Sequence, residues 1–224
     1  MAKNKIDDPD YNDNRNYNYS NNTSSDREEY QIISSMISPN SSVIDLGCGN
    51  GFLLKKLIIE KNAICKGMEI SESAVSICKE NGLDVSMGRI DARLPYDNDS
   101  FDYSICNVTI QMVNYPEVLL KEMGRISKFQ IISFPNFAFY KNRLDLLIRG
   151  RMPKPMLFGY KWYNTGHLHQ LSIKDFYDLV NDANGLKINE VILQESTNRI
   201  KNLLMKKFPN LFQVLPVFKL EKVI

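Results

Sequence analysis

A glycine-rich segment, Val43-Ile-Asp-Leu-Gly-Cys-Gly-Asn-Gly51, carries the clearest chemical signal in the chain. It stands between a short apolar run, expected to be a buried strand, and a stretch expected to be a helix from 52 to 61. Glycines let backbone N–H groups approach a ligand closely, and here they are Gly47, Gly49 and Gly51. The spacing is GxGxG, with Phe52 where a dinucleotide-binding fingerprint would have its third glycine.

An acidic residue, Asp45, precedes this loop by two positions and falls near the carboxyl end of the expected strand. A carboxylate there would repel a pyrophosphate and attract an ammonium or sulfonium group. The segment therefore disfavours NAD or FAD, and with them a nicotinamide-dependent oxidoreductase, and it favours a cationic ligand.

Two further acids follow the next expected strands. Glu69 ends the strand expected at 64–70, where an acidic side chain can accept both hydroxyls of a ribose. Asp91 follows the third strand and is expected to accept the exocyclic N–H of an adenine. Each acid taken alone is better explained as a helix cap or a solvated loop residue. Together they mark the carboxyl ends of parallel strands, where open α/β sheets bind ligands.

The elements that must position these residues alternate along the chain. Near-continuous apolar runs predict strands at 43–46, 64–70, 84–87, 101–106 and 129–134. Helical spacing predicts helices at 27–38, 52–61, 71–81 and 116–125. This order predicts a parallel sheet covered on both faces.

The C-terminal part is expected to differ. Ser172 and Asp175 resemble a capping box at the start of another helix. Residues 186–193 and 212–221 are interpreted as two strands with no helical period between them, paired antiparallel at one sheet edge.

The sequence over about 43–135 resembles the class I S-adenosylmethionine-dependent methyltransferases, whose successive motifs are matched by 43–51, 67–70, 91–92 and 94–102. The resemblance implies a three-layer, Rossmann-like α/β fold with a seven-stranded sheet, mostly parallel with an antiparallel last strand. It also implies that S-adenosylmethionine is the cofactor. The residues it assigns to cofactor binding are Asp45, Gly47, Cys48, Gly49, Gly51, Glu69, Ile70, Asp91, Ala92 and Asn107.

The second half is similar to the MetW family of methionine biosynthesis proteins. The similarity lies in 133–137, 143–153, 160–165, His167-x-His169 and 172–176, and also in Thr109-Ile-Gln111. It implies a link to homoserine O-acyltransferase. Two functions stay open: a methyltransferase acting on an unidentified small-molecule acceptor, and a regulatory S-adenosylmethionine-binding subunit that docks on the acyltransferase.

His167 and His169 are the two histidines of the chain. Their HxH spacing has no evident third ligand, so no metal site is expected. Packed or hydrogen-bonding loop residues are the plain interpretation. As a general base near the acceptor pocket, either is a weak catalytic candidate.

Residues 27–224 are expected to form a single domain with a lid or docking insertion at 137–171. Its helix has an apolar stripe and a basic flank, which a solvated surface helix also explains. Residues 1–26 are rich in Asn and are expected to be a flexible arm, or alternatively one that orders over a ligand.

Composition excludes several classes of protein. The 224 residues are 43% hydrophobic and 24% charged, as in globular proteins, and the net charge of +2 gives no indication of nucleic-acid binding. No run approaches the roughly 18 apolar residues of a membrane span, and no signal peptide is evident. Four scattered cysteines favour reduced thiols, so a cytoplasmic protein without a membrane partner is expected.

Overall fold

The structure is a computed structural model that describes residues 27–153, 162, 166–193 and 198–223. The expected N-terminal arm, 1–26, lies outside the described residues, as do 154–161 and 163–165 of the expected insertion. Within the described residues, no helix is long and apolar enough to cross a membrane.

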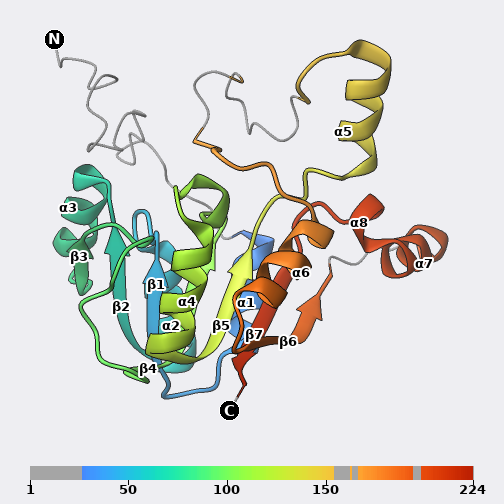
Figure 1. Cartoon of the computed structure of the whole chain (residues 1–224). Coiled ribbons are helices and arrows are strands. Elements are labelled where there is room, and N and C mark those ends of the chain that lie inside the picture. Colours follow the sequence, from blue (N-terminus) through green and yellow to red (C-terminus); the bar gives the residue numbers. More distant parts are fainter. Residues whose placement is uncertain (1–26, 154–161, 163–165, 194–197, 224) are drawn as a thin grey trace, which may run out of the picture.

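A single seven-stranded sheet organises the molecule, in the order β3-β2-β1-β4-β5-β7-β6 (Figure 1). Its strands are β1 Ser42–Leu46, β2 Ile64–Glu69, β3 Val85–Met87, β4 Phe101–Asn107, β5 Ser127–Ser133, β6 Leu186–Ile192 and β7 Val217–Lys222. Strands β1 to β5 pair in parallel, and β7 runs antiparallel to both β5 and β6. The predicted fold, a mostly parallel Rossmann-like sheet with a reversed last strand, is confirmed.

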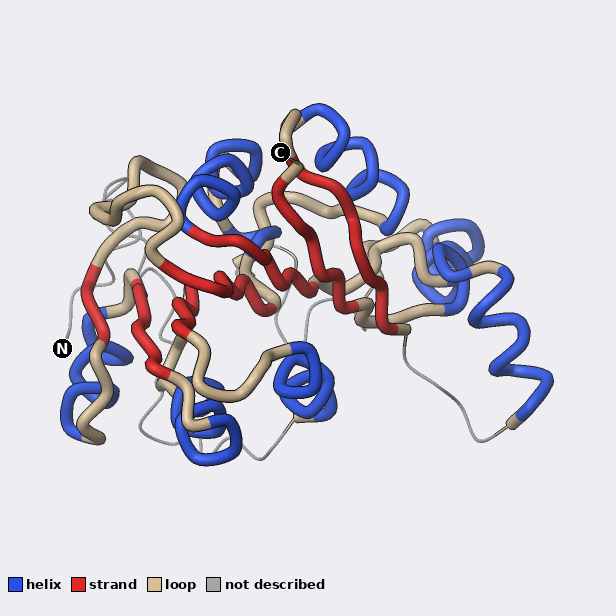
Figure 2. The backbone as a smooth tube through the Cα atoms, turned by 90° about the horizontal axis from the view of Figure 1, so that it is seen from below, coloured by secondary structure: helices blue, strands red, loops and turns tan. Residues whose placement is uncertain are grey.

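Helices cover both faces of this sheet (Figure 2). They are α1 Glu28–Met36, α2 Phe52–Lys61, α3 Glu72–Glu80, α4 Pro116–Ile126, α5 Tyr140–Leu144, α6 Ile173–Asp182, α7 Arg199–Lys207 and α8 Pro209–Phe212. A 3₁₀ turn, η2 Ile110–Met112, follows β4, and a π-helical turn, η3 Asp145–Arg149, continues α5.

Alternation along the strands divides the core into two layers. Ile44 and Leu46 on β1 pack in one cluster with buried side chains of α4 and α6. Val43 on the same strand packs in the other cluster with α1 and α2. Because successive strand residues point to opposite faces, each central strand contributes to both layers. The β-strands are therefore covered on both sides, as their apolar composition predicted.

Local sequence explains where several helices begin. The hydroxyl of Ser71 accepts from the N–H of Ala74 and caps α3. At α6, Ser172 and Asp175 exchange both bonds of the expected capping box. Both helices start where the sequence predicted.

One expectation about the C-terminal part is wrong. Helices α7 and α8 lie between β6 and β7, where no helical period was expected, and β7 begins at Val217 rather than at 212. Three of the four apolar residues of α7, Ile200, Leu203 and Leu204, do have helical spacing, but the segment is so basic that its apolar stripe is narrow.

Candidate functional site

Asp45 is the most deeply buried of the three acids of the site. It is the fourth residue of β1, aligned with Gly67 of β2 and Ile105 of β4, and its residue is 2% exposed. Its Oδ1 atom has no hydrogen-bond partner. Burial, with a further contribution from the charge of Glu69, raises the pKa of Asp45 from 3.8 to about 7. An interior carboxylate in this state needs either a proton or a cation beside it.

The glycine loop after β1 adopts a left-handed backbone at each glycine, with φ of +85° at Gly47, +54° at Gly49 and +75° at Gly51. The three glycine N–H groups are used inside the chain. They donate to the Met68 carbonyl (2.8 Å), the Glu69 Oε2 (2.8 Å) and the Cys48 carbonyl (3.0 Å). The approach of these N–H groups to a ligand stays a prediction, and it would require bonds within the chain to open.

The satisfied loop has a chemical consequence. A pyrophosphate needs several N–H donors aimed at it, and these three are already engaged. The loop therefore suits a cationic or neutral ligand group better than an anion, in agreement with the carboxylate of Asp45.

Close approach to the turn after β4 explains why glycine is required at position 47. A Cβ added to Gly47 would lie 2.6 Å from Cγ2 of Thr109. The loop after β1 and the turn after β4 thus meet at van der Waals distance, and these two segments form adjoining walls of the site.

Glu69, at the end of β2, connects the loop to α3. Its Oε2 accepts from Gly49, and its Oε1 accepts from the N–H groups of Ile70 (2.8 Å) and Ser71 (3.0 Å). A carboxylate offers about four acceptor positions, so one remains for a hydroxyl of a ligand. The binding of both ribose hydroxyls by Glu69 stays a prediction.

Asp91 is more fully occupied. It forms a bidentate pair with Arg89 (3.1 and 3.0 Å) and also accepts from the N–H groups of Asn114 (2.8 Å) and Tyr115 (3.3 Å). Contact of Asp91 with an adenine stays a prediction. The neighbouring Ala92 is exposed.

The turn after β4, which adjoins the glycine loop, has a strained backbone. Asn107, the last residue of β4, accepts a hydrogen bond from the hydroxyl of Ser133. Val108 has φ of +52°, which is unusual for a β-branched residue, and its N–H donates to Ser133. Strain of this kind concentrates at ligand sites.

Gln111, in the same turn, is a site residue that sequence reasoning did not single out. It is buried, its Nε2 donates to the Val108 carbonyl (3.1 Å), and its Oε1 has no partner. Its backbone carbonyl accepts from the N–H groups of Leu168 (2.9 Å) and His169 (3.0 Å). The histidine segment is therefore held beside the end of β4. The similarity at 109–111 was the available signal.

Cys48 and Cys78 meet behind the loop. Their thiols hydrogen-bond to each other, which raises the pKa of Cys48 and lowers that of Cys78. The Cys78 thiol also donates to the Gly49 carbonyl (3.3 Å). All four cysteines are free thiols. Among the residues with described structure, no group of three or more His, Cys, Asp or Glu side chains could hold a metal ion.

A family model for the methionine biosynthesis protein MetW matches residues 27–220. The chain belongs to the MetW family. It is 38% identical over 174 residues to a bifunctional methionine biosynthesis protein MetXA/MetW from Rhodopirellula baltica. The match covers 72% of this chain and 27% of that protein, so the chain spans about a quarter of its relative's length.

Solved structures share the fold at low identity. A S-adenosylmethionine-dependent methyltransferase from Thermotoga maritima, a possible histamine N-methyltransferase, superimposes with a TM-score of 0.62, 21% identity and 87% coverage of both chains. A methyltransferase from Mesorhizobium loti gives 0.60 at 14% identity, covering 87% of this chain and 97% of its own. The [4+2]-cyclase SpnF gives 0.62 at 14%, covering 88% and 81%. This MetW chain thus has a methyltransferase-like fold, and the fold alone does not decide the reaction.

Proposed function

We propose that this MetW protein binds S-adenosylmethionine at the carboxyl ends of β1, β2 and β4 and transfers its methyl group to a small-molecule acceptor. The observation that carries the proposal is the buried Asp45 carboxylate, whose Oδ1 has no hydrogen-bond partner among the residues that the structure describes. A fixed positive charge beside Asp45 would compensate the cost of burying it.

The chain's own residues fit such a ligand. Asp45 would hold a cationic group, the remaining acceptor position of Glu69 would take a ribose hydroxyl, and the glycine loop would let the ligand lie against bare backbone. When bound, S-adenosylmethionine supplies a methyl group on a sulfonium that leaves as a neutral thioether. The residues of the chain then only position an acceptor in line with that carbon, which is where much of the acceleration arises.

Calorimetry with S-adenosylmethionine and, separately, with NAD tests the binding step. We expect saturable binding of the first and none of the second, because the loop offers no free glycine N–H for a pyrophosphate. Binding of NAD, or of neither compound, would overturn the proposal.

Turnover is tested separately. Formation of S-adenosylhomocysteine is followed while members of a small-metabolite panel are added. A slow basal rate that one acceptor stimulates supports methyl transfer. Tight cofactor binding without stimulation by any acceptor would leave a binding protein and refute the enzyme.

A second candidate function is favoured by one observation. The relative from Rhodopirellula baltica carries MetXA and MetW in a single chain. Fusion places two proteins at high effective concentration, as is useful for partners that act together. We therefore also propose that this chain docks on a homoserine O-acyltransferase and reports the cofactor level to it. Co-purification from the source cell tests this, and recovery of the chain without any acyltransferase would refute it.

A further inference from the structure

Two short helical segments project from the same side of the molecule, away from β3 (Figure 1). The first segment is residues 140–153, which comprise α5, η3 and the four residues after them. The second is residues 199–208, which comprise α7 and Phe208. We call residues 140–153 and 199–208 together the basic face. They contain eight Lys or Arg residues and one acid, Asp145, in a chain whose total is 28 basic and 26 acidic residues.

Large apolar side chains are exposed to solvent on both segments. Leu147 is 82% exposed and Ile148 74%, while on α7 Ile200 is 74% exposed and Leu203 67%. On each helix these residues, with Leu144 or Leu204, follow the i, i+3, i+4 spacing of helices that bind in a partner's groove.

The two segments are fixed to each other through α8. The ring of Tyr140 on α5 packs against that of Phe212 on α8, with centroids 5.6 Å apart. The buried amide of Asn136 donates to the carbonyls of Asn210 (3.1 Å) and Gln213 (2.8 Å). On the other side, α7 packs on α8 and buries Met205. Both segments of exposed residues are therefore packed against α8.

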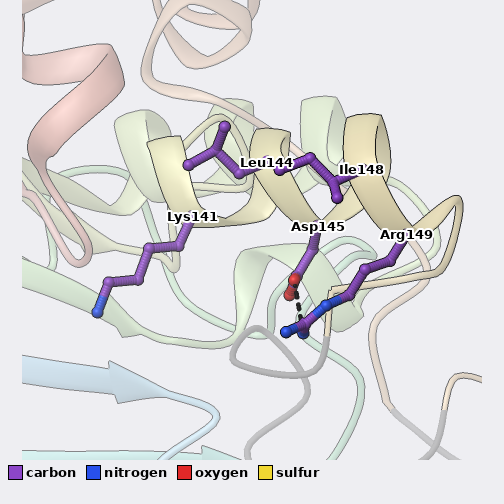
Figure 3. Close-up of a pocket in the computed structure, with 5 residues that line it drawn as sticks. All are labelled: Lys141, Leu144, Asp145, Ile148 and Arg149. Atoms are coloured by element: carbon purple, nitrogen blue, oxygen red, sulfur yellow. Dashed lines mark hydrogen bonds and ion pairs between the residues drawn. The ribbon is translucent and has the colours of Figure 1, made fainter.

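A hollow of about 400 Å³ on α5 and η3 is lined by Lys141, Leu144, Asp145, Ile148 and Arg149 (Figure 3). Leu144 and Ile148 supply its apolar part, and Arg149 pairs with Asp145 at 2.9 Å. Since this pair neutralises the single acid, the rim stays positive through Lys141. Such a hollow fits an apolar side chain flanked by carboxylates.

We infer that the basic face is the surface by which this chain docks on homoserine O-acyltransferase, through an acidic patch that presents apolar side chains. The inference rests on the second proposed function and adds the location and chemistry of the contact. Docking of this kind would account for the residue types of the basic face. Its apolar residues supply the affinity, and its Lys and Arg residues steer the approach of an acidic partner.

Binding of the purified acyltransferase from the same organism is measured by interferometry for the wild type, Leu147→Asp and Ile200→Asp. We expect each substitution to weaken binding by about tenfold or more, as at the centre of an interface. The matched control is Ile59→Asp on α2, where the isoleucine is 72% exposed on another part of the molecule. Its affinity should equal that of the wild type.

Charge is tested in the same way. Arg151→Glu should weaken binding and reduce its dependence on salt, whereas Lys121→Glu on α4, also exposed, should do neither. Circular dichroism and the affinity for S-adenosylmethionine confirm that every variant is folded, and Leu147→Ser replaces Leu147→Asp if the latter is not.

The outcomes separate the claims. If the wild type binds the acyltransferase and the variants bind equally well, the basic face is the wrong surface and docking itself stands. If the wild type does not bind the acyltransferase, the proposal of docking and the inference about its surface are both refuted. Binding of S-adenosylmethionine is then judged by calorimetry alone. If the wild type binds phosphatidylserine vesicles instead of the acyltransferase, and the variants lose that binding, the basic face is a lipid-binding surface and the inference is overturned.

Discussion

Replacing Asp45 by Asn removes the buried charge while keeping the shape of the side chain. If the carboxylate holds a cationic group of S-adenosylmethionine, the amide loses a charge-assisted hydrogen bond of about 1.5–3 kcal/mol. We therefore expect a loss of affinity of about 10- to 150-fold.

Because the pKa of Asp45 is about 7, we also expect cofactor binding to depend on pH. In the free protein Asp45 must lose its proton before it can pair with a cation. Below pH 7 the affinity of the wild type should then fall by about tenfold per pH unit, and above pH 7 it should level off. Asp45→Asn should bind weakly with little dependence on pH over the same interval.

Calorimetry from pH 5 to pH 8 measures both effects, with Asp178→Asn on the exposed side of α6 as a control that should behave like the wild type. Titration with S-adenosylhomocysteine, which keeps the ammonium but lacks the sulfonium charge, identifies the group that Asp45 holds. An Asp45→Asn variant that binds as tightly as the wild type, or a wild-type affinity that is flat across pH 7, would refute the reasoning.

The free protein should respond in the opposite sense. The folded pKa of Asp45, about 7, lies above the ordinary value of 3.8, so the stability associated with this group is fully present below pH 3.8 and is lost as pH rises to 7. That loss amounts to about 4 kcal/mol at most. Without ligand, Asp45→Asn should therefore unfold at higher urea concentration than the wild type at pH 8. A lower midpoint would contradict the burial argument.

Two further substitutions, one in the glycine loop and one on α4, are tested by urea unfolding. Gly47→Ala should lower the free energy of unfolding by about 1–2 kcal/mol for its left-handed φ and by about 1–3 kcal/mol more for the clash with Thr109. Gly82→Ala, with φ of +73° and open space around it, should lose only the first contribution. Equal losses for the two variants would show that the clash with Thr109 is relieved at no cost. Glu122→Gln should cost about 1.5–3 kcal/mol, because Glu122 pairs bidentately with Arg125 at 2.6 and 2.9 Å. This pairing lowers the pKa of Glu122, so its stabilisation is present above the ordinary pKa and lost as pH falls, and the wild-type advantage over Glu122→Gln should shrink in acid.

The fold could be predicted because its signals are local. Buried strands are apolar runs, and helices begin at caps such as Ser71 and Ser172. The exception was α7, whose four apolar residues lie among basic residues, so that its sequence resembles a solvated tail. Its helix is supported by packing of Met205 and by α8, and such tertiary contacts cannot be recognised from a short window of sequence.

The site was predicted in part. The sequence placed Asp45 and Glu69 at neighbouring strand ends, and their charges do interact in the structure. It could not show that Glu69 accepts from Gly49, or that Asp91 is held by Arg89, because these bonds depend on the exact course of the loops. Gln111 and the strained Val108 were missed for the same reason, because a valine in the sequence gives no indication of a left-handed backbone.

The position of β7 between β5 and β6 has a consequence for synthesis. The ribosome makes β7 after β6, yet β6 pairs only with β7, and β5 has an open edge until β7 arrives. The nascent chain therefore holds an exposed row of backbone N–H and C=O groups while residues 134–216 are being translated. During that interval it depends on chaperones or on speed to avoid aggregation at that edge.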